Sequence, residues 1–242
     1  MSTPASRIEE HNHMRTREVG VAFLTPAFLG NAEQNGQWRT PPFKHLLREW
    51  WRIVWSEAND WSNDVDALRR AEGNLFGSAA DETGHRSRVR IRLDCWSPGT
   101  LDKWEGDPSV FHPEVGVNGK NVGAHLYLGY GPLNFNKGTY LGKKEGRNNF
   151  KPHAAIQAGE SARLRLAFPA ADEEWLDRTL ALIHAFGTLG GRSRNGWGSI
   201  ALEGVGALDS LPLRDWRDCL DREWPHAIGR DDQGALVWQT EP

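Results

Sequence analysis

The sequence predicts an α+β fold in which two amphipathic helices alternate with four short strands. Apolar residues recur at helical spacing after Pro42 and again after Asp172, and they alternate with arginines in residues 86–94 and 162–168. A further strand before the first helix and another after the second complete the order strand, helix, strand, strand, helix, strand. This is the order of the ferredoxin-like βαββαβ unit.

The first strand is predicted over residues 18–24, where apolar side chains precede the break at Thr25-Pro26. Residues 1–17 are polar and carry no pattern, which predicts a disordered leader. They also lack the apolar segment of a secretory signal, so no signal peptide is expected.

The first helix has the clearest pattern, because its apolar residues fall in one continuous stripe. The stripe consists of Phe43, Leu46, Leu47, Trp50, Trp51 and Val54. Lys44, Arg48 and Arg52 are spaced by four and form a cationic ridge along another side of the helix. Like charges at this spacing destabilise an isolated helix by roughly 0.2–0.5 kcal/mol per pair. The ridge therefore indicates either a bound anion or an ordinary solvated face.

Two segments alternate with the period of a strand. Residues 86–94 carry apolar side chains at 89, 91 and 93 and arginines at 88, 90 and 92. Residues 162–168 repeat the pattern, with arginines at 163 and 165. Both segments predict half-buried strands with a basic outer face, which can meet an anion or simply solvent.

The second helix is predicted from an N-cap at Asp172, with two acidic residues in its first turn, to Phe186 before Gly187. The last strand is predicted over residues 199–205. The ferredoxin-like domain, whose topology also occurs in the RNA-recognition motif, then covers residues 18–206. A long insertion, residues 96–159, separates its second and third strands.

The insertion and the tail have weaker patterns. We expect one strand over residues 124–130 and a mobile, glycine-rich basic segment over residues 137–151. Residues 207–242 form a C-terminal extension with a short helix predicted over residues 213–223.

Composition limits the class of protein. A chain of 242 residues and 27.2 kDa forms one large domain or two small ones. No apolar run is long enough to span a membrane. Cys95 and Cys219 lie far apart without a CxxC pair, which argues against a disulfide framework and a cysteine zinc site and favours the cytoplasm.

Charge is distributed unevenly along the chain. The net charge is −3, but residues 120–167 hold 8 basic and 2 acidic residues, and residues 203–232 hold 4 basic and 8 acidic ones. Arginine dominates, with 22 Arg against 7 Lys, and the chain is rich in Gly and Trp. This composition suits a nucleic-acid surface, although a GC-rich genome produces the same bias.

A glycine-rich loop follows the second helix, with the sequence GTLGGRSRNGWG over residues 187–198. Its glycines allow close approach to a ligand, and Arg192 and Arg194 supply charge for phosphate. It is neither a P-loop nor a Rossmann fingerprint, because no Gly-Lys-Ser/Thr follows and a helix precedes it. A tight structural turn is the alternative explanation.

Three blocks together resemble a known family. They are residues 25–30 (TPAFLG), residues 39–44 (RTPPFK) followed by the arginine–tryptophan helix, and residues 72–77 (EGNLFG) together with the loop at 190–198. The combination is similar to the repeat-associated mysterious proteins (RAMPs) of CRISPR effector complexes, and most of all to the first subunit of the type III-B (Cmr) complex.

The resemblance implies a non-catalytic RNA-binding subunit that contacts guide RNA near its 3′ end and/or target RNA, beside other RAMP subunits. Binding is then largely sequence-independent and weakens with salt. We expect the cationic ridge and the glycine loop to converge on one groove. The residues assigned to RNA are Arg39, Lys44, Arg48, Arg52, Lys143, Lys144, Arg147, Lys151, Gly191, Arg192, Ser193, Arg194 and Trp197.

No catalytic residue, metal or cofactor is predicted. The loop over residues 25–42 holds only one carboxylate, Glu33, which is a poor metal site. The main alternative is a RAMP endoribonuclease that processes CRISPR precursor RNA with His45 or His85 as general base. A scaffold that contacts only neighbouring proteins is the third hypothesis.

Overall fold

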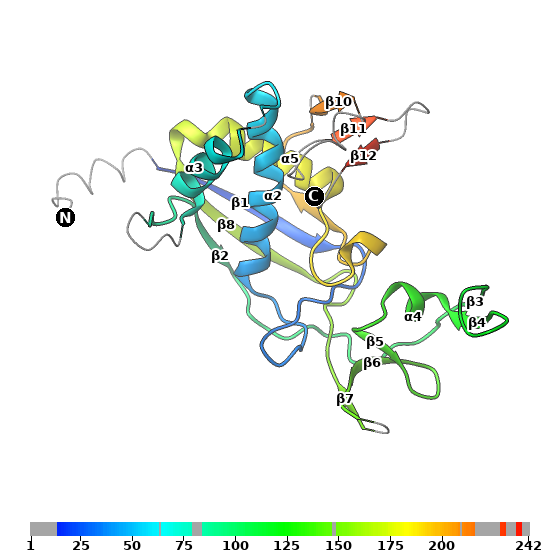
Figure 1. The fold of residues 1–242 in the computed structure, drawn as a ribbon. Coiled ribbons are helices and arrows are strands. Elements are labelled where there is room, and N and C mark those ends of the chain that lie inside the picture. Colours follow the sequence, from blue (N-terminus) through cyan, green and yellow to red (C-terminus); the bar gives the residue numbers. More distant parts are fainter. Residues whose placement is uncertain are drawn as a thin grey trace.

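A four-stranded antiparallel sheet forms the centre of the molecule (Figure 1). Its strands are β1 (Met14–Phe23), β2 (Arg90–Leu93), β8 (Ser161–Pro169) and β9 (Ile200–Glu203), in the order β2-β8-β1-β9. Helices lie beside this sheet, so the predicted α+β class is confirmed. The computed structural model describes residues 14–62, 64–78, 84–146, 149–208, 210–215, 228–230 and 236–238.

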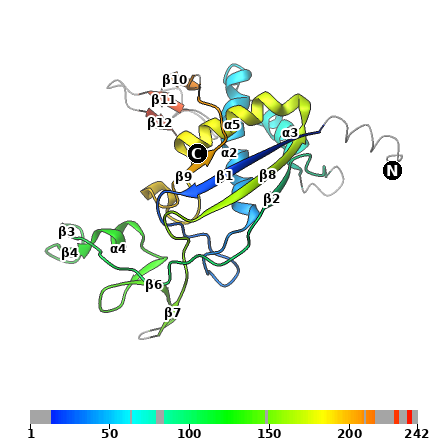
Figure 2. The same cartoon turned by 180° about the vertical axis from the view of Figure 1, so that it is seen from behind.

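Two long helices cover one face of the sheet and a third packs beside them. They are α2 (Thr40–Ala58), α5 (Glu173–Phe186) and α3 (Val65–Phe76), the last of which contacts α2. Seen from behind, the opposite face of the sheet carries no helix among the described residues (Figure 2). Arg163 projects from this open face and pairs with Glu18 at 2.8 Å.

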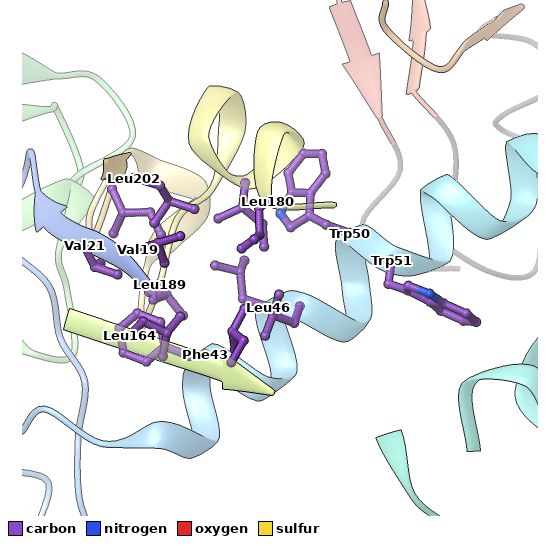
Figure 3. Close-up of a cluster of buried hydrophobic side chains, with 14 of the residues drawn as sticks. Val19, Val21, Phe43, Leu46, Trp50, Trp51, Leu164, Leu180, Leu189 and Leu202 are labelled. Atoms are coloured by element: carbon purple, nitrogen blue, oxygen red, sulfur yellow. The ribbon is translucent and has the colours of Figure 1, made fainter. Parts of the chain in front are cut away.

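The apolar stripe of α2 is buried, as its spacing predicts. Phe43, Leu46 and Trp50 point toward the sheet and α5, whereas Trp51 points to the other side of the helix (Figure 3). There the Trp51 ring meets that of Phe76 on α3, with centroids 5.7 Å apart. The helix begins with prolines in its first turn, where a missing backbone N–H removes no helical hydrogen bond.

Strand β8 alternates as predicted, and β2 alternates over Arg90–Leu93, a shorter range than the predicted 86–94. Leu164, Leu166 and Phe168 are at most 2% exposed, whereas the arginines at 163 and 165 are exposed. The predicted helix from Asp172 also forms, as a 3₁₀ turn over Ala170–Asp172 that leads into α5. Strand β9 is shorter than the predicted 199–205 and ends at Glu203.

Strand β1 begins at Met14, four residues before the predicted start. Residues 14–17 of the predicted leader therefore belong to the sheet, and they pair with residues 166–169 of β8. Arg17 is held there by Asp177 and Glu173 of α5, at 2.8 and 2.6 Å. A strand can continue through polar residues where its neighbours supply such partners. Residues 1–13 lie outside the described residues.

Helix α3 was not predicted, because its buried side includes a charged residue. Leu68, Leu75 and Phe76 are buried, and so is Glu72 between them. The start of the helix is capped by Asp64, whose side chain accepts a hydrogen bond from the N–H of Ala67 at 2.8 Å.

The predicted insertion, which lies between β2 and β8 in the sequence, forms a small unit that projects from one end of the sheet (Figure 1). A second hydrophobic cluster, which includes Leu133 and Leu141 of the insertion and Phe28 of the loop after β1, joins it to the domain. Its elements are β3 (Ser109–His112), β4 (Lys120–Gly123), α4 (Ala124–Leu128), β5 (Leu133–Phe135), β6 (Thr139–Lys144) and β7 (Phe150–Pro152).

The strand predicted over residues 124–130 is wrong, since residues 124–128 form helix α4. The carboxylate of Asp107 accepts hydrogen bonds from the N–H groups of His125 and Leu126, at 2.8 and 3.0 Å. A cap supplied from so far along the chain leaves no local signal in the sequence. This distant contact explains why a short apolar segment becomes a helical turn.

The predicted C-terminal helix is also wrong over residues 213–215, the part of it that the structure describes. Residues 213–215 form strand β10, which pairs with β11 (Ile228–Arg230), and β11 pairs with β12 (Leu236–Trp238). Residues 216–223 lie outside the described residues.

Within the part that the structure describes, no helix is both long and apolar enough to cross a bilayer. Cys95 is a free thiol.

Replacing a buried side chain of helix α5 tests this hydrophobic core. Leu182 is fully buried, so Leu182→Ala should lower the free energy of unfolding by about 2–5 kcal/mol. Urea denaturation measures this change. Leu24→Ala is the matched control, because that side chain is 62% exposed and should lose less than about 0.5 kcal/mol. Equal losses in the two variants would contradict this assignment of the core.

Candidate nucleic-acid interface

The cationic ridge of α2 is met by a buried carboxylate. Glu72 of α3 is 2% exposed and accepts hydrogen bonds from both arginines of the ridge. The Arg52 guanidinium donates to its two oxygens at 2.7 and 3.0 Å, and Arg48 donates through Nε. The ridge therefore joins α2 to α3, and much of its charge is used inside the protein.

The electrostatics of this cluster favour the charged form of Glu72. Burial opposes the charge, but the hydrogen bonds and charges of Arg52 and Arg48 outweigh it and hold the pKa of Glu72 below its ordinary value. Burial, together with the charge of Arg48, lowers the pKa of Lys44, the third residue of the ridge. Each of these cations is less available to an outside anion than one on a free helix face.

A groove runs between the start of α2 and the glycine loop. Of the residues assigned to RNA from the sequence, four line it, namely Arg39, Gly191, Ser193 and Arg194. Lys44, Arg48 and Arg52 do not line it, because they project from another side of the helix. The expected convergence of the ridge and the loop on one groove is therefore wrong in the part that the structure describes. The groove receives Arg39 and His45 from the helix instead.

Arg39 is the polar group that best fits an anion in this groove. It lies at the N-cap position of α2, and its side chain makes no cap hydrogen bond. Its Nε is buried and has no hydrogen-bond partner among the described residues. A buried guanidinium donor without a partner is costly. The same guanidinium lines the groove, where its charge can attract a phosphate. Arg194 of the glycine loop also lines the groove.

The glycine loop is a tight turn whose backbone donors are largely used internally. The N–H groups of Leu189, Gly191 and Gly198 donate to backbone carbonyls at 2.8 to 3.0 Å. Gly198 has φ +71°, and a Cβ there would lie 1.9 Å from the Leu189 oxygen, so only glycine fits. The structural-turn explanation holds for these donors. Phosphate contact from this loop therefore depends mainly on side chains.

Three residues of the same loop turn toward the insertion. The Arg192 Nε donates to the carbonyl of Tyr130 at 2.6 Å, and the Asn195 amide donates to that of Leu128 at 2.7 Å. Trp197 is 8% exposed and packs against Trp104 of the insertion, with ring centroids 5.2 Å apart. Arg192 and Trp197, both assigned to RNA from the sequence, thus attach the insertion to the domain.

The lysines predicted in the insertion lie together on two adjacent strands. Lys143 and Lys144 are exposed on β6, and Lys151 on β7 is the direct cross-strand neighbour of Lys143. Burial and the charges of Lys151 and Lys143 lower the pKa of the buried His153. Arg147 lies outside the described residues. These lysines are separate from the groove lining.

Sequence reasoning named His45 only as a candidate general base, and it missed two contributions to the groove, the pairing of His45 with Glu49 and an aromatic stack. His45 and Glu49 line it and form a pair at 3.1 Å, one turn apart on α2. The rings of Trp50 and Phe186, stacked with centroids 5.9 Å apart, form an apolar stretch of its wall. The i,i+4 spacing of His45 and Glu49 was a usable signal, whereas Phe186 lies on another helix and gave none.

The described residues hold no group of three His, Cys, Asp or Glu side chains that could bind a metal ion. Of the other histidines, His184 accepts a hydrogen bond from the N–H of Leu202 at 3.0 Å and links α5 to β9. His85 is exposed and does not line the groove.

Comparisons with known proteins identify a family. A model described as the RAMP superfamily matches residues 21–201. The apo crystal structure of Cmr1 from Pyrococcus furiosus is 18% identical with a TM-score of 0.44, over 78% of this chain and 49% of that one. The present chain thus spans about half the length of Cmr1.

Two assemblies contain further similar chains. One chain of a type IV-B CRISPR complex is 14% identical with a TM-score of 0.44, over 86% of this chain and 99% of that one. One chain of a type III-B Cmr-beta complex bound to cognate target RNA is 12% identical with a TM-score of 0.41, over 84% and 63% respectively. No curated protein matches the sequence.

The buried carboxylate generates a prediction about stability. Glu72→Gln should cost roughly 1–3 kcal/mol at neutral pH, because it removes the charge that two guanidinium groups share. The cost stays below that of a fully buried pair, since the Arg48 side chain is 36% exposed. In the wild type this contribution is complete above the ordinary glutamate pKa of about 4.3 and is lost as the pH falls through the lowered pKa of the folded state.

Urea denaturation of both proteins between neutral and acidic pH measures this effect. The difference in stability between wild type and Glu72→Gln should shrink as the pH falls below about 4.3, the ordinary glutamate pKa. Glu33→Gln, at an exposed position, is the control and should follow the wild type. A constant difference at every pH would show that the charge of Glu72 does not stabilise the fold.

Proposed function

Because the chain belongs to the RAMP superfamily, we propose that it is an RNA-binding subunit of a type III-B (Cmr) CRISPR ribonucleoprotein effector complex. In this proposal it acts in antiviral defence in the cytoplasm, contacts guide RNA near its 3′ end and/or target RNA, and adjoins other RAMP subunits. The support is the family match over residues 21–201 and the sequence blocks that resemble the first Cmr subunit.

We also propose that the central domain is a ferredoxin-like RAMP fold. The strand order β2-β8-β1-β9 supports this, as does the position of one helix, α2, after the first strand and another, α5, between the third and fourth. The proposed insertion, residues 96–159, lies between the second and third strands of that sheet. The additional helix α3 follows α2.

The observation that carries the proposal is a groove lined by two arginines, Arg39 and Arg194, in which the Nε of Arg39 has no hydrogen-bond partner among the described residues. Two guanidinium groups that face one groove can bind successive phosphates of a strand through charge-assisted hydrogen bonds. Such contacts recognise the backbone and not the base sequence. RNA binding here is therefore expected to be sequence-independent.

We propose that this binding is not accompanied by catalysis. The nuclease alternative is favoured by one observation, the position of His45 in the groove. However, the hydrogen bond that His45 donates to the Glu49 carboxylate raises the pKa of His45, which increases the protonated fraction and leaves less neutral imidazole to accept a proton. The arrangement suits phosphate binding better than abstraction of a proton from a 2′-hydroxyl.

The groove makes a quantitative prediction. Replacing Arg39 and Arg194 together by alanine should weaken single-stranded RNA binding and make the log–log dependence of affinity on salt shallower, by roughly 0.7 for each phosphate that the protein no longer binds. Titrations of full-length chain with labelled RNA at several salt concentrations measure this slope. The variant removes no cap hydrogen bond, since the Arg39 side chain makes none.

The matched control is the double alanine variant of Arg90 and Arg92. It removes the same charge, but its arginines are exposed on β2, on the open face of the sheet. Its slope should equal that of the wild type. If the two double variants changed the slope equally, only net charge would matter and the groove would not be the binding site.

Absence of catalysis is tested directly. The full-length chain, incubated with labelled CRISPR repeat RNA in the presence of a chelator, should leave the RNA intact, because the imidazole of His45 is engaged by the Glu49 carboxylate. Denaturing gels at several pH values measure this. Discrete products that disappear in His45→Ala would instead establish the endoribonuclease.

A further inference from the structure

The insertion contains a three-stranded antiparallel sheet, β5-β6-β7, whose two faces differ. Leu133 and Leu141 are cross-strand partners on one face, and both are buried in the second cluster. Successive residues of a strand point to opposite faces, so Tyr140 and Lys144 of β6 share the other face. Phe150 is the cross-strand partner of Lys144 and belongs to that face as well. We call this side the aromatic face.

The ring of Tyr140 lies over a glycine. Gly142 has φ +150°, and a Cβ built there would lie 2.7 Å from Cε1 of Tyr140 and 3.1 Å from the Cα of Pro152. No larger residue fits without moving this ring or the backbone of β7. The glycine thus allows an aromatic ring to lie close against the sheet. Tyr140 stays half-buried, so part of its ring remains accessible.

Phe150 stands beside this ring as a wall. The two ring centroids are 5.5 Å apart and the planes meet at 72°. One ring lies against the sheet and the second stands nearly perpendicular to it, and we call the angle between them the recess. A planar heterocycle can stack on the first ring while its edge meets the second, which is the geometry that aromatic pairs prefer.

The surroundings of the recess are basic. Lys144 shares its face, whereas Lys143 and Lys151 are cross-strand partners on the opposite face of the same strands. All three are exposed, and Glu145 is the one acidic residue among the described residues 143–146 and 149–152. Like charges directly opposite on antiparallel strands destabilise a sheet. A polyanion beside them would relieve this repulsion.

We propose that the aromatic face binds the bases of single-stranded RNA, with one base stacked on Tyr140 beside Phe150 and a neighbouring phosphate on Lys144. Aromatic platforms flanked by cations are the common means of holding single strands without sequence preference. This inference rests on the proposed function and extends it. The groove holds the sugar-phosphate backbone, and the insertion holds bases.

The test compares two ligands that differ only in their bases. The full-length chain is titrated with a mixed-sequence single-stranded RNA and with a length-matched oligonucleotide that lacks bases. Tyr140→Leu should weaken binding of the RNA by about 5- to 150-fold, the loss expected for one stacking ring. Binding of the abasic oligonucleotide should stay unchanged, and so should the salt slope, because the substitution leaves every phosphate-binding side chain in place.

Two controls separate stacking from folding. Tyr140→Phe keeps the ring and should keep the affinity of the wild type. Tyr130→Leu makes the same substitution as Tyr140→Leu at a tyrosine that is 62% exposed elsewhere in the insertion, and it should change neither affinity.

Phe150→Leu removes the second ring of the recess. It should weaken binding of the RNA but not binding of the abasic oligonucleotide. It thereby provides a second variant if Tyr140→Leu does not fold.

The outcomes are distinguishable. If the wild type binds both ligands with equal affinity, and no variant at Tyr140 or Phe150 changes the ratio of the two affinities, the inference is overturned while the groove proposal stands. That result would assign the aromatic face to a neighbouring protein. If wild type binds neither ligand, the proposed function fails and this inference fails with it.

Discussion

Packing of the α2 stripe against the sheet and α5 fixes the orientation of that helix, and this orientation decides what each of its charged side chains can meet. With Phe43, Leu46 and Trp50 in the core, one polar side of the helix is turned to α3 and another to the glycine loop. Arginines on the first side bind the buried Glu72, and residues on the second side line the groove. Cations of equal charge on one helix thereby acquire different roles.

The glycine loop has a comparable double role, because it touches the domain and the insertion at once. Its tight backbone is fixed by hydrogen bonds to the loop after β1, including the one from Gly191 to Phe28 at 3.0 Å. From this support Arg194 lines the groove, while Arg192 binds a carbonyl of the insertion. A turn without left-handed glycines could not hold both side chains in these places. The groove and the insertion therefore share one structural support.

The sequence predicted the elements whose pattern is local and failed where a distant partner decides. Alternation in β2 and β8 and the stripes of α2 and α5 follow from spacing, and they were correct. Helix α4 depends on Asp107, and the role of the α2 ridge depends on Glu72. Neither contact leaves a periodic signal. For the same reason the groove contains Arg39 and only part of the predicted loop set, Gly191, Ser193 and Arg194, and it does not contain the ridge.

A subunit that binds guide strands has to satisfy one requirement, and both the groove and the aromatic face would satisfy it. Guide RNAs differ in sequence from one complex to the next, since base pairing carries the specificity, so a subunit that holds them must not depend on hydrogen bonds to base edges. Guanidinium groups in a groove contact phosphates, which every strand offers. Aromatic rings stack on any base, because every base has a π-face. The groove and the aromatic face would thus hold the two parts of a nucleotide that do not encode its identity.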